Sequence, residues 1–245
     1  MAMIPITERK YTLVEKIDET PEVLILKFMP EDNQPTPFDP GMFMMIVGVD
    51  SSGNRYTGRA FSIASDPSVP GMDFMVIKEP THGDHIGRPH FVDAKIGDVF
   101  FMRGPNGQFR FDPSVDKKAI FLAGGTGLAP FISMLRHIKS SGSQCDTVLL
   151  YSTKYSTEII LKEELKSYVA DLHTKLVITV TRPQPGDGWT GQTGHITADT
   201  IKNYAPDYAE RTAYICGPLA FVKAVKDALV SLGMQNEKIK ADVWG

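Results

Sequence analysis

Hydrophobic and polar residues are arranged differently in the two halves of the chain. Up to about residue 113, short apolar runs alternate with turn sequences such as Asp39-Pro40-Gly41 and Val69-Pro70-Gly71. Short strands at this spacing predict an antiparallel barrel or sandwich. One short helix is expected within Ile86–Ala94. The predicted strands include Val23–Phe28, Phe43–Val49, Phe61–Ala64, Phe74–Lys78 and Val99–Arg103.

From about Lys117 onward, the pattern changes to strands that alternate with helices. Ala119–Ala123 is continuously apolar, as expected of a parallel strand that is buried on both faces. This alternation predicts a doubly wound parallel α/β sheet. We therefore expect two domains, residues 1–113 and 114–245, with a boundary near Phe111–Asp116. The other predicted helices are Ala129–Ile138, Glu158–Ala170, Thr197–Tyr204 and Leu219–Leu232, and the other strands are Thr147–Tyr151, Leu176–Val180, Ala213–Ile215 and Ile239–Trp244.

Charge and composition narrow the class of protein. The formal net charge is -3 over 245 residues, which is too small to indicate general binding to nucleic acids or anionic membranes. No apolar run is long enough to span a bilayer, and the first residues lack the apolar segment of a secretory signal. We expect a cytoplasmic protein without membrane insertion.

Cysteine and histidine residues give little support for a metal site. Cys145 and Cys216 are the two cysteines of the chain, which is too few for an iron–sulfur cluster held by four cysteines. His82, His85 and His90 are close in sequence, but no matching set of carboxylates or thiols accompanies them. We therefore expect two free thiols and no bound metal.

A glycine-rich turn lies directly between the first predicted parallel strand and its helix. The turn reads Gly124-Gly125-Thr126-Gly127-Leu128-Ala129-Pro130. A diphosphate at a helix N-terminus meets unpaired N–H groups and the positive end of the helix dipole. Glycines permit this close approach, and Pro130 suits the first turn of a helix. The spacing differs from the GxGxxG fingerprint, and glycines also form tight turns that bind no ligand.

Four motifs follow one another in a fixed order. They are Arg59-Ala60-Phe61-Ser62, Gly104-Pro105-Asn106-Gly107-Gln108-Phe109, the glycine-rich turn and Cys216-Gly217-Pro218. Together they resemble the ferredoxin–NADP reductase family, and the resemblance extends from about Tyr11 to Gly245. It implies a six-stranded antiparallel β-barrel that holds a flavin, followed by a nucleotide-binding α/β domain. The strand pattern read independently from the sequence agrees with this architecture.

The resemblance implies roles for residues of the first half. Arg59 matches the arginine that binds the flavin diphosphate, for which a guanidinium fork is well shaped. Phe61 matches an aromatic residue on the isoalloxazine ring, although the family more often has tyrosine there. Ser62 matches a hydroxyl near flavin N5, or it is an ordinary strand serine. Ala60 and Ile77 are expected beside the same flavin.

A second phosphate-binding segment departs from the family pattern. The turn Lys95-Ile96-Gly97-Asp98 is present, but Arg88 stands where serine or threonine is common. Arg88 either reaches a phosphate or lies in solvent, and the resemblance places Pro89 and Phe91 beside the cofactor. FAD is favoured over FMN, although this departure weakens the assignment.

The resemblance also implies residues that contact the pyridine nucleotide. Cys216 matches a cysteine beside nicotinamide C4 that orients the ring without acting as a nucleophile, and the alternative is a buried structural thiol. Trp244 either covers the flavin where nicotinamide must enter or packs against the last strand. The remaining expected contacts of the nucleotide are Gly125, Thr126, Gly127, Pro130, Gly217 and Pro218.

Two basic residues bear on the choice between NADPH and NADH. Lys154 follows the second strand of the α/β half, and Arg182 follows the third. A cation near the ribose favours the additional 2′-phosphate of NADP, so NADPH is preferred over NADH if both side chains point inward. If they are solvated surface charges, this preference disappears.

The resulting hypothesis is a flavin-dependent NAD(P)H oxidoreductase, with Ser62, Cys216 and Trp244 nearest the chemistry. Its expected partner is a ferredoxin, a flavodoxin or a subunit that carries an iron–sulfur cluster, because this chain lacks the cysteines for a cluster of its own. One alternative is an NAD(P)H-flavin reductase or diaphorase. The other is an accessory electron-transfer subunit of a larger complex. The sequence does not indicate the oligomeric state.

Overall fold

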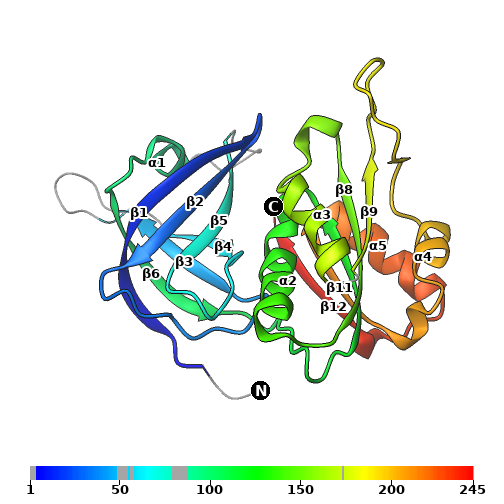
Figure 1. The fold of residues 1–245 in the computed structure, drawn as a ribbon, viewed down its shortest axis with the longest axis horizontal. Helices are drawn as coiled ribbons and strands as arrows, with labels where there is room; N and C mark the ends of the chain where they lie inside the picture. The colour runs from blue at the N-terminus through cyan, green and yellow to red at the C-terminus, as the bar shows by residue number, and fades with distance from the viewer. Residues whose placement is uncertain (1–3, 49–54, 56–57, 79–87, 173, 245) are drawn as a thin grey trace.

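The computed structural model describes residues 4–48, 55, 58–78, 88–172 and 174–244. Two bodies lie side by side in it, with the N-terminal half forming a curved antiparallel sheet and the C-terminal half a parallel sheet flanked by helices (Figure 1). The division at residues 113 and 114 stays a prediction. The last strand of the first sheet ends at Asn106, and the first strand of the second begins at Lys118.

The N-terminal sheet has the strand order β4-β3-β6-β1-β2-β5 in the described residues. All its pairings are antiparallel. Its edges nearly meet, because the Ala64 N–H, just beyond β4, donates a hydrogen bond to the carbonyl of Asp73 in β5 at 2.9 Å. The result is the near-barrel that the sequence predicts. Its elements are β1 (Thr7–Thr20), β2 (Val23–Pro30), β3 (Phe43–Gly48), β4 (Arg59–Ser62), β5 (Met72–Ile77), α1 (Arg88–Asp93) and β6 (Val99–Asn106).

Aromatic rings fill the interior of the barrel. Phe28 makes edge-to-face contacts with Phe74 and Phe100, at centroid distances of 5.9 and 5.2 Å. Phe91 of α1 stacks on Phe100 at 5.7 Å, so the helix closes one end of this core. Such pairs contribute packing energy beyond the area that they bury.

The C-terminal sheet has the order β10-β9-β8-β7-β11-β12, and all its pairings are parallel. Helices α2 and α3 cover the face toward the barrel, and α4 and α5 cover the other face (Figure 1). The fold is therefore doubly wound, as predicted. Its strands and α-helices are β7 (Lys118–Gly124), α2 (Ala129–Ser141), β8 (Asp146–Thr153), α3 (Lys162–Asp171), β9 (Lys175–Val180), β10 (Gln192–Thr193), α4 (Ala198–Tyr204), β11 (Thr212–Pro218), α5 (Leu219–Ser231) and β12 (Ile239–Trp244).

Among the described residues, one of the three buried hydrophobic clusters contains residues of both halves. Val23, Ala64 and Met75 of the barrel belong to the same buried cluster as Phe131 and Met134 of α2. The linker contributes as well, because Phe109 lies edge-on to Phe131 (6.1 Å) and to Tyr214 of β11 (5.4 Å). Burial of apolar surface on both sides fixes the barrel against α2.

Most predicted elements are confirmed, with shifts at their ends. The strand expected at Phe61–Ala64 runs instead over Arg59–Ser62, and the helix expected from Glu158 begins at Lys162. Ile159 and Ile160 are buried beneath the loop before that helix, and Leu161 has a left-handed backbone with φ of 50°. The segment expected to form the first turn of this helix is therefore a loop that buries Ile159 and Ile160.

Within the described residues, no helix has both the length and the apolar character needed to cross a lipid bilayer.

Candidate functional site

The order of strands in the parallel sheet reverses direction between β7 and β11. From β7 the chain adds β8 and β9 on one side, whereas β11 and β12 lie on the other. Open α/β sheets bind ligands outside the carboxyl ends of the strands at such a switch point. The glycine-rich turn leaves β7 there, and Cys216-Gly217-Pro218 ends the neighbouring strand β11. The two motifs singled out in the second half thus meet at one place.

Glycines of the turn serve two different purposes. A Cβ on Gly127 would lie 2.3 Å from the carbonyl oxygen of Cys216 and 2.7 Å from Cα of Gly217, so this glycine permits close packing of two backbones. A Cβ on Gly124 would lie 2.9 Å from the Phe221 ring. Gly125 has a φ of 55° and no atom within 4 Å of its Cβ position. Only Gly125 therefore presents open space in front of the turn.

A single-turn 3₁₀ helix, Gly125–Leu128, leads into α2. Thr126 lies in this turn, and Pro130 is the second residue of α2. The side chains of the turn make no capping hydrogen bond to the start of α2. The turn runs directly into α2, since the Ala129 N–H donates to the Thr126 carbonyl and Pro130 has no N–H. The first N–H groups of this continuous helix, which lack partners within it, are therefore those of the turn itself, and they are suited to an anionic ligand.

Cys216 is fully buried, and its carbonyl rather than its thiol contacts the glycine turn. Burial is the main cause that raises the pKa of this thiol well above its usual range, and the carboxyl of Asp242 adds to the effect. Asp242 lies opposite Cys216 in the parallel pairing of β11 with β12. Burial raises the pKa of Asp242 as well. Sequence reasoning missed Asp242, because its position beside Cys216 depends on the order of the strands.

The residues expected around the flavin lie on β4 and α1. Phe61 is half-buried, and its ring lies edge-on to Phe91 at 5.0 Å and to Phe74 at 6.3 Å. Phe91 itself is buried in the barrel core. The structure thus brings Phe61 and Phe91 together, although they are far apart in sequence.

The other residues of the strand are more accessible than Phe91. Arg59 and Ser62 are half-buried, and Ala60 between them is exposed. In the sheet, Arg59 lies opposite Ile46 of β3. Ile77, also half-buried, ends β5, the strand at the other edge of the sheet, which closure of the barrel brings back beside β4.

Some expected contacts fall outside the described residues. His82 and His85 are not described, and of Arg88, Pro89 and His90 only the backbone in α1 is described. Trp244 ends β12 opposite Pro218, but its side chain is likewise outside the described part. The end of β12 lies between the two halves of the molecule, as Figure 1 shows.

Lys154 and Arg182 lie on neighbouring strand ends, where the Arg182 N–H donates to the Lys154 carbonyl at 2.8 Å. The Lys154 ammonium is 4.0 Å from the carboxylate of Glu22 in the barrel. Two further carboxylates lie in the segments that follow β8 and β9. Glu158 accepts a hydrogen bond from the Lys154 N–H, and Asp187 accepts one from the Ser156 hydroxyl at 3.1 Å.

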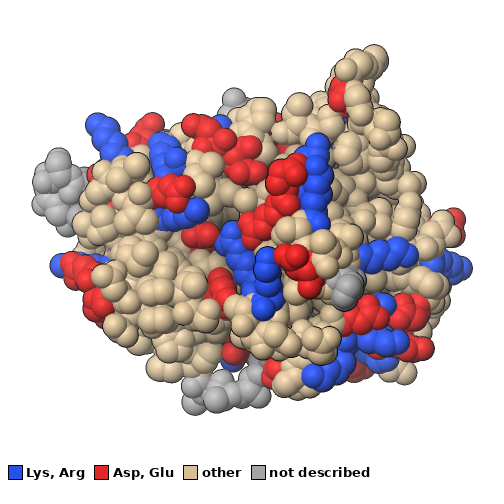
Figure 2. Space-filling view, viewed as in Figure 1, with Lys and Arg blue, Asp and Glu red and all other residues tan. Residues whose placement is uncertain are grey.

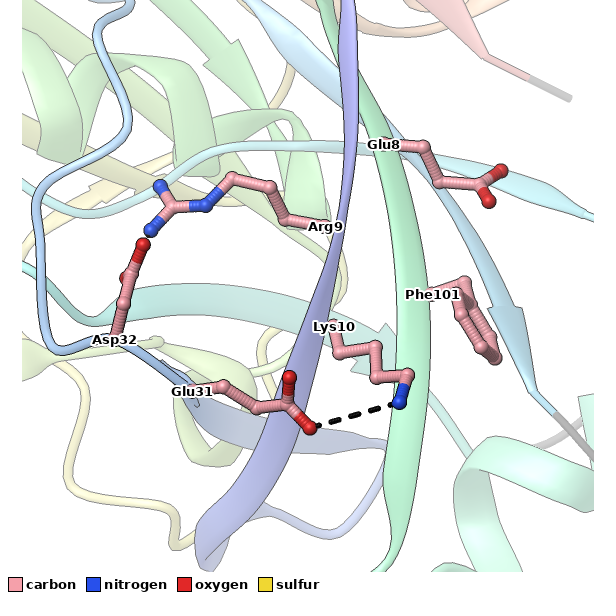
Figure 3. A pocket seen from close by; sticks show the side chains of 6 residues that line it. All are labelled: Glu8, Arg9, Lys10, Glu31, Asp32 and Phe101. Atoms are coloured by element: carbon pink, nitrogen blue, oxygen red, sulfur yellow. Dashed lines mark hydrogen bonds and ion pairs between the residues drawn. The ribbon is translucent and has the colours of Figure 1, made fainter.

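A hollow of about 370 Å³ on the outer wall of the barrel is lined by charged residues from two segments and by Phe101 of β6 (Figure 3). Arg9 and Asp32 point toward each other, and Lys10 pairs with Glu31 at 3.7 Å. These cations and anions satisfy one another, so we assign the hollow no ligand. Among the described residues, no group of three or more His, Cys, Asp or Glu side chains is placed to hold a metal.

The sequence matches the family model described as an oxidoreductase NAD-binding domain over residues 121–227. It is 32% identical over 151 residues to NADH-cytochrome b5 reductase 1 of Kluyveromyces lactis, covering 61% of this chain and 54% of the relative. It is 28% identical over 233 residues to the glycine betaine monooxygenase reductase subunit of Pseudomonas aeruginosa, covering 95% of this chain and 63% of that subunit. The chain thus spans little more than half the length of these two relatives.

Solved structures with the same fold include reductases of several systems. The ferredoxin reductase in carbazole 1,9a-dioxygenase superposes with a TM-score of 0.84 at 22% identity, covering all of this chain and 71% of that one. The cytochrome b5 reductase domain of Ulva prolifera nitrate reductase gives 0.80 at 24% identity, covering 96% and 97% of the two chains. The shared fold includes both halves of the molecule.

Proposed function

We propose that this chain, an oxidoreductase with an NAD-binding domain and the two-domain fold of the ferredoxin reductase family, binds FAD and passes electrons from a reduced pyridine nucleotide to a one-electron acceptor. One observation supports this most directly. The glycine turn at the switch point and the strand Arg59–Ser62 belong to two bodies that are joined by one shared buried cluster. A hydride donor and a hydride acceptor need such a fixed arrangement.

The residues of β4 and α1 fit a flavin. Arg59 supplies a guanidinium for a diphosphate, Phe61 supplies a half-buried ring, and Ser62 supplies a hydroxyl at the end of the strand. We assign Ala60, Ile77, Arg88, Pro89 and Phe91 to the same pocket. When bound, the flavin accepts a hydride and releases electrons singly, whereas the protein supplies position and electrostatics.

The switch point fits a pyridine nucleotide. Gly125 leaves room at the start of the 3₁₀ turn that leads into α2, where backbone N–H groups would favour a diphosphate, and we assign Thr126 to the same contact. Pro130 withholds a donor that this first turn does not need. Gly127 and Gly217 hold the two backbones together, so they shape the site without touching the ligand.

Cys216 keeps its proton at Sγ, because burial disfavours the thiolate. It therefore lines the wall of the nicotinamide site as an uncharged thiol and does not act as a nucleophile. Asp242 lies beside it and is a further group that we assign to this wall. We place Trp244 at the entrance, since the end of β12 lies between the two halves (Figure 1).

We propose NADH as the preferred donor, in contrast to the preference for NADPH that two basic residues suggest in the sequence. Lys154 and Arg182 do lie together, but the Lys154 ammonium is 4.0 Å from the Glu22 carboxylate, and Glu158 accepts a hydrogen bond from the Lys154 N–H. Two carboxylates beside Lys154 reduce the positive charge that it could offer a 2′-phosphate. The relative from Kluyveromyces lactis is named as an NADH enzyme, which agrees with this choice.

The acceptor is a separate one-electron carrier, for which we propose a ferredoxin, a flavodoxin or a cluster-bearing oxygenase subunit. The glycine betaine monooxygenase reductase subunit supports a reductase component of an oxygenase system. Cys145 and Cys216 are both buried and are too few for a cluster within these 245 residues. Free-flavin reduction would require the flavin to dissociate readily, and the next experiment separates these cases.

Flavin retention in an Arg59→Met variant tests the flavin site. Arg55→Met is the matched control, because Arg55 lies on the outer wall, paired with Glu8 at 2.8 Å and over the ring of Phe101. We expect Arg59→Met to bind FAD at least 10-fold more weakly and Arg55→Met to retain it, as measured by the visible spectrum after gel filtration. Equal retention in both variants would contradict the assignment, and loss of FAD from the wild type would favour a free-flavin reductase.

A further inference from the structure

Helix α2 is hydrogen-bonded to the segment that directly follows β4 (Arg59–Ser62), which we call the flavin strand because we assign its residues to the flavin site. The Ser133 hydroxyl donates to the Ser65 carbonyl at 2.6 Å, and this bond is buried. One turn later, Arg136 Nη1 donates to the Ala64 carbonyl at 3.1 Å and to Asp73 Oδ2 at 2.7 Å. We call these three bonds the interdomain clamp. They join α2 of the nucleotide half to two segments of the barrel.

The guanidinium of Arg136 is oriented from its other side by α3. Arg136 Nε and Nη2 donate to the two oxygens of Glu164, at 2.7 and 2.9 Å. Tyr168 donates its hydroxyl proton to the same carboxylate. The side chain of Arg136 is 23% exposed, so its ion pairs are partly shielded from water. A two-pronged pair of this kind fixes a guanidinium plane more firmly than a single contact does.

The clamp lies a short distance along the chain from both halves of the proposed site. Ala64 and Ser65 follow Ser62 almost directly, and Ser133 lies six residues beyond Gly127. Four of these steps, from Ala129 to Ser133, lie in α2 and correspond to about 6 Å of helix at 1.5 Å of rise per residue. Helix α2 therefore forms a rigid connection between the glycine turn and the segment that follows the flavin strand.

The clamp adds bonds of defined direction to the buried cluster that the two halves share. The barrel-side members of this cluster, such as Val23 and Met75, make contacts that have little directional preference. Hydrogen bonds to a carbonyl and a carboxylate are directional. Loss of the clamp is therefore expected to leave the fold intact while loosening the alignment of the two sites.

We propose that Arg136 and Ser133 are positioning residues, which set the geometry of hydride transfer by holding the flavin strand against the nucleotide turn. This inference rests on the proposed function. Neither residue belongs to the set assigned to cofactor contact. A misplacement of about 1 Å in such a step can cost 100-fold in rate.

The test compares Arg136→Gln, Arg136→Lys and Ser133→Ala with the wild type by anaerobic stopped-flow reduction with NADH. Arg136→Gln should lower the limiting rate of flavin reduction at least 10-fold, with the apparent Kd for NADH changed less than threefold. Ser133→Ala should be intermediate. Arg136→Lys should recover part of the rate, because lysine keeps the charge but lacks the fork.

Lys139→Met is the control on the same helix, since Lys139 is 51% exposed and pairs with Asp171 at the surface. It should leave the limiting rate unchanged. A rate for Arg136→Gln within twofold of the wild type, or an effect confined to the Kd, would overturn the proposal. If Arg136→Gln does not fold, Ser133→Ala and Asp73→Asn decide the same question.

A second measurement does not depend on the reaction. Spin labels on Val99→Cys in the barrel and Val230→Cys on α5 occupy exposed sites, whereas both native thiols are buried. Arg136→Gln should broaden the distribution of distances between the labels, and an unchanged distribution would overturn the proposal. If the wild type is reduced by neither nucleotide, the proposed function fails, and this distribution still decides the role of the clamp.

Discussion

At the scale of single residues, burial decides what the two cysteines do. Cys145 donates its thiol proton to the Asp116 carbonyl at 2.9 Å, and burial raises its pKa to about 12. The Cys216 thiol is buried in the core beside Asp242, and its pKa is raised as well. The thiolate is the reactive form of cysteine, so both side chains are inert in the folded protein.

Thiol titration checks this directly. With Ellman's reagent at pH 8, the native protein should show neither thiol reacting within minutes, and the protein unfolded in guanidinium should show two. The thiol pKa values are higher in the folded state, so their ionisation favours unfolding only as pH rises above about 9. One rapidly reacting thiol in the native protein would contradict the placement of these residues.

Gly127 is the residue of the turn for which no side chain has room. We expect Gly127→Ala to lower the free energy of unfolding by about 2 kcal/mol, because its methyl group would lie within 2.3 Å of a backbone oxygen. Affinity for NADH should fall with it, as measured by fluorescence quenching.

Gly142→Ala is the control for backbone strain alone. Gly142 ends α2 with a φ of 64° and open space around its Cβ position. Its substitution should cost about 1 kcal/mol and leave the affinity for NADH unchanged. Equal effects of the two substitutions on affinity would contradict the distinction between packing and strain.

At the scale of elements, Arg211 ties three strands together at the amino end of the parallel sheet. Its side chain is 6% exposed, and it donates to Asp146 (2.9 Å), to Asp207 (2.8 Å) and to the Ala119 carbonyl (3.2 Å). Its hydrogen bond is the main cause that lowers the pKa of Asp207. Asp207 therefore stabilises the fold above its unfolded pKa near 3.8, and that contribution is lost as pH falls below this value.

Substitution of Arg211 measures this contribution. Arg211→Met should destabilise the protein by about 2 to 3 kcal/mol in urea unfolding at pH 7, because a buried carbonyl and two carboxylates lose their partner. Its stability should also fall less than that of the wild type between pH 5 and 3. Lys166→Met, which breaks an exposed pair with Glu163, should change little. A steeper loss in the Arg211 variant at low pH would contradict the account.

The sequence predicts the parallel half of the fold better than the barrel. Ala119–Ala123 is apolar throughout, so its burial on both faces is evident without the structure. β1 is harder to recognise, because charged Arg9 and Glu15 stand at every-second positions from buried Tyr11 and Leu13, and the register shifts between Leu13 and Glu15. The start of α3 was misplaced because helical periodicity does not reveal the left-handed backbone at Leu161.

The candidate site was predictable where a motif lies within one segment. The alternating pattern places the glycine turn and Cys216 at the carboxyl edge of one parallel sheet, whereas their direct contact depends on the strand order, which the structure shows. Asp242 and Arg136 were not identified, since each acquires its partners from a distant segment. A charged residue at a semi-buried strand position, as in Ala241-Asp242-Val243, is the signal that marks Asp242.

At the scale of the whole molecule, two bodies with separate sheets behave as one structural unit. The core shared by the barrel, the linker and α2 makes their relative placement part of the fold. Positive and negative side chains are interleaved across the face shown in Figure 2, so that face offers no large area of one sign for a charged partner. The proposed electron transfer therefore depends on the arrangement of the two bodies rather than on a charged patch of this face.

The most direct test of this account is an anaerobic titration of the purified protein with NADH and, separately, NADPH, followed by visible absorbance. The account predicts a yellow protein with flavin absorbance, which NADH bleaches at about one equivalent and NADPH bleaches more slowly. A protein that binds neither FAD nor FMN on reconstitution would contradict the central claim. A flavin-containing protein that neither nucleotide reduces would instead indicate an accessory electron-transfer subunit.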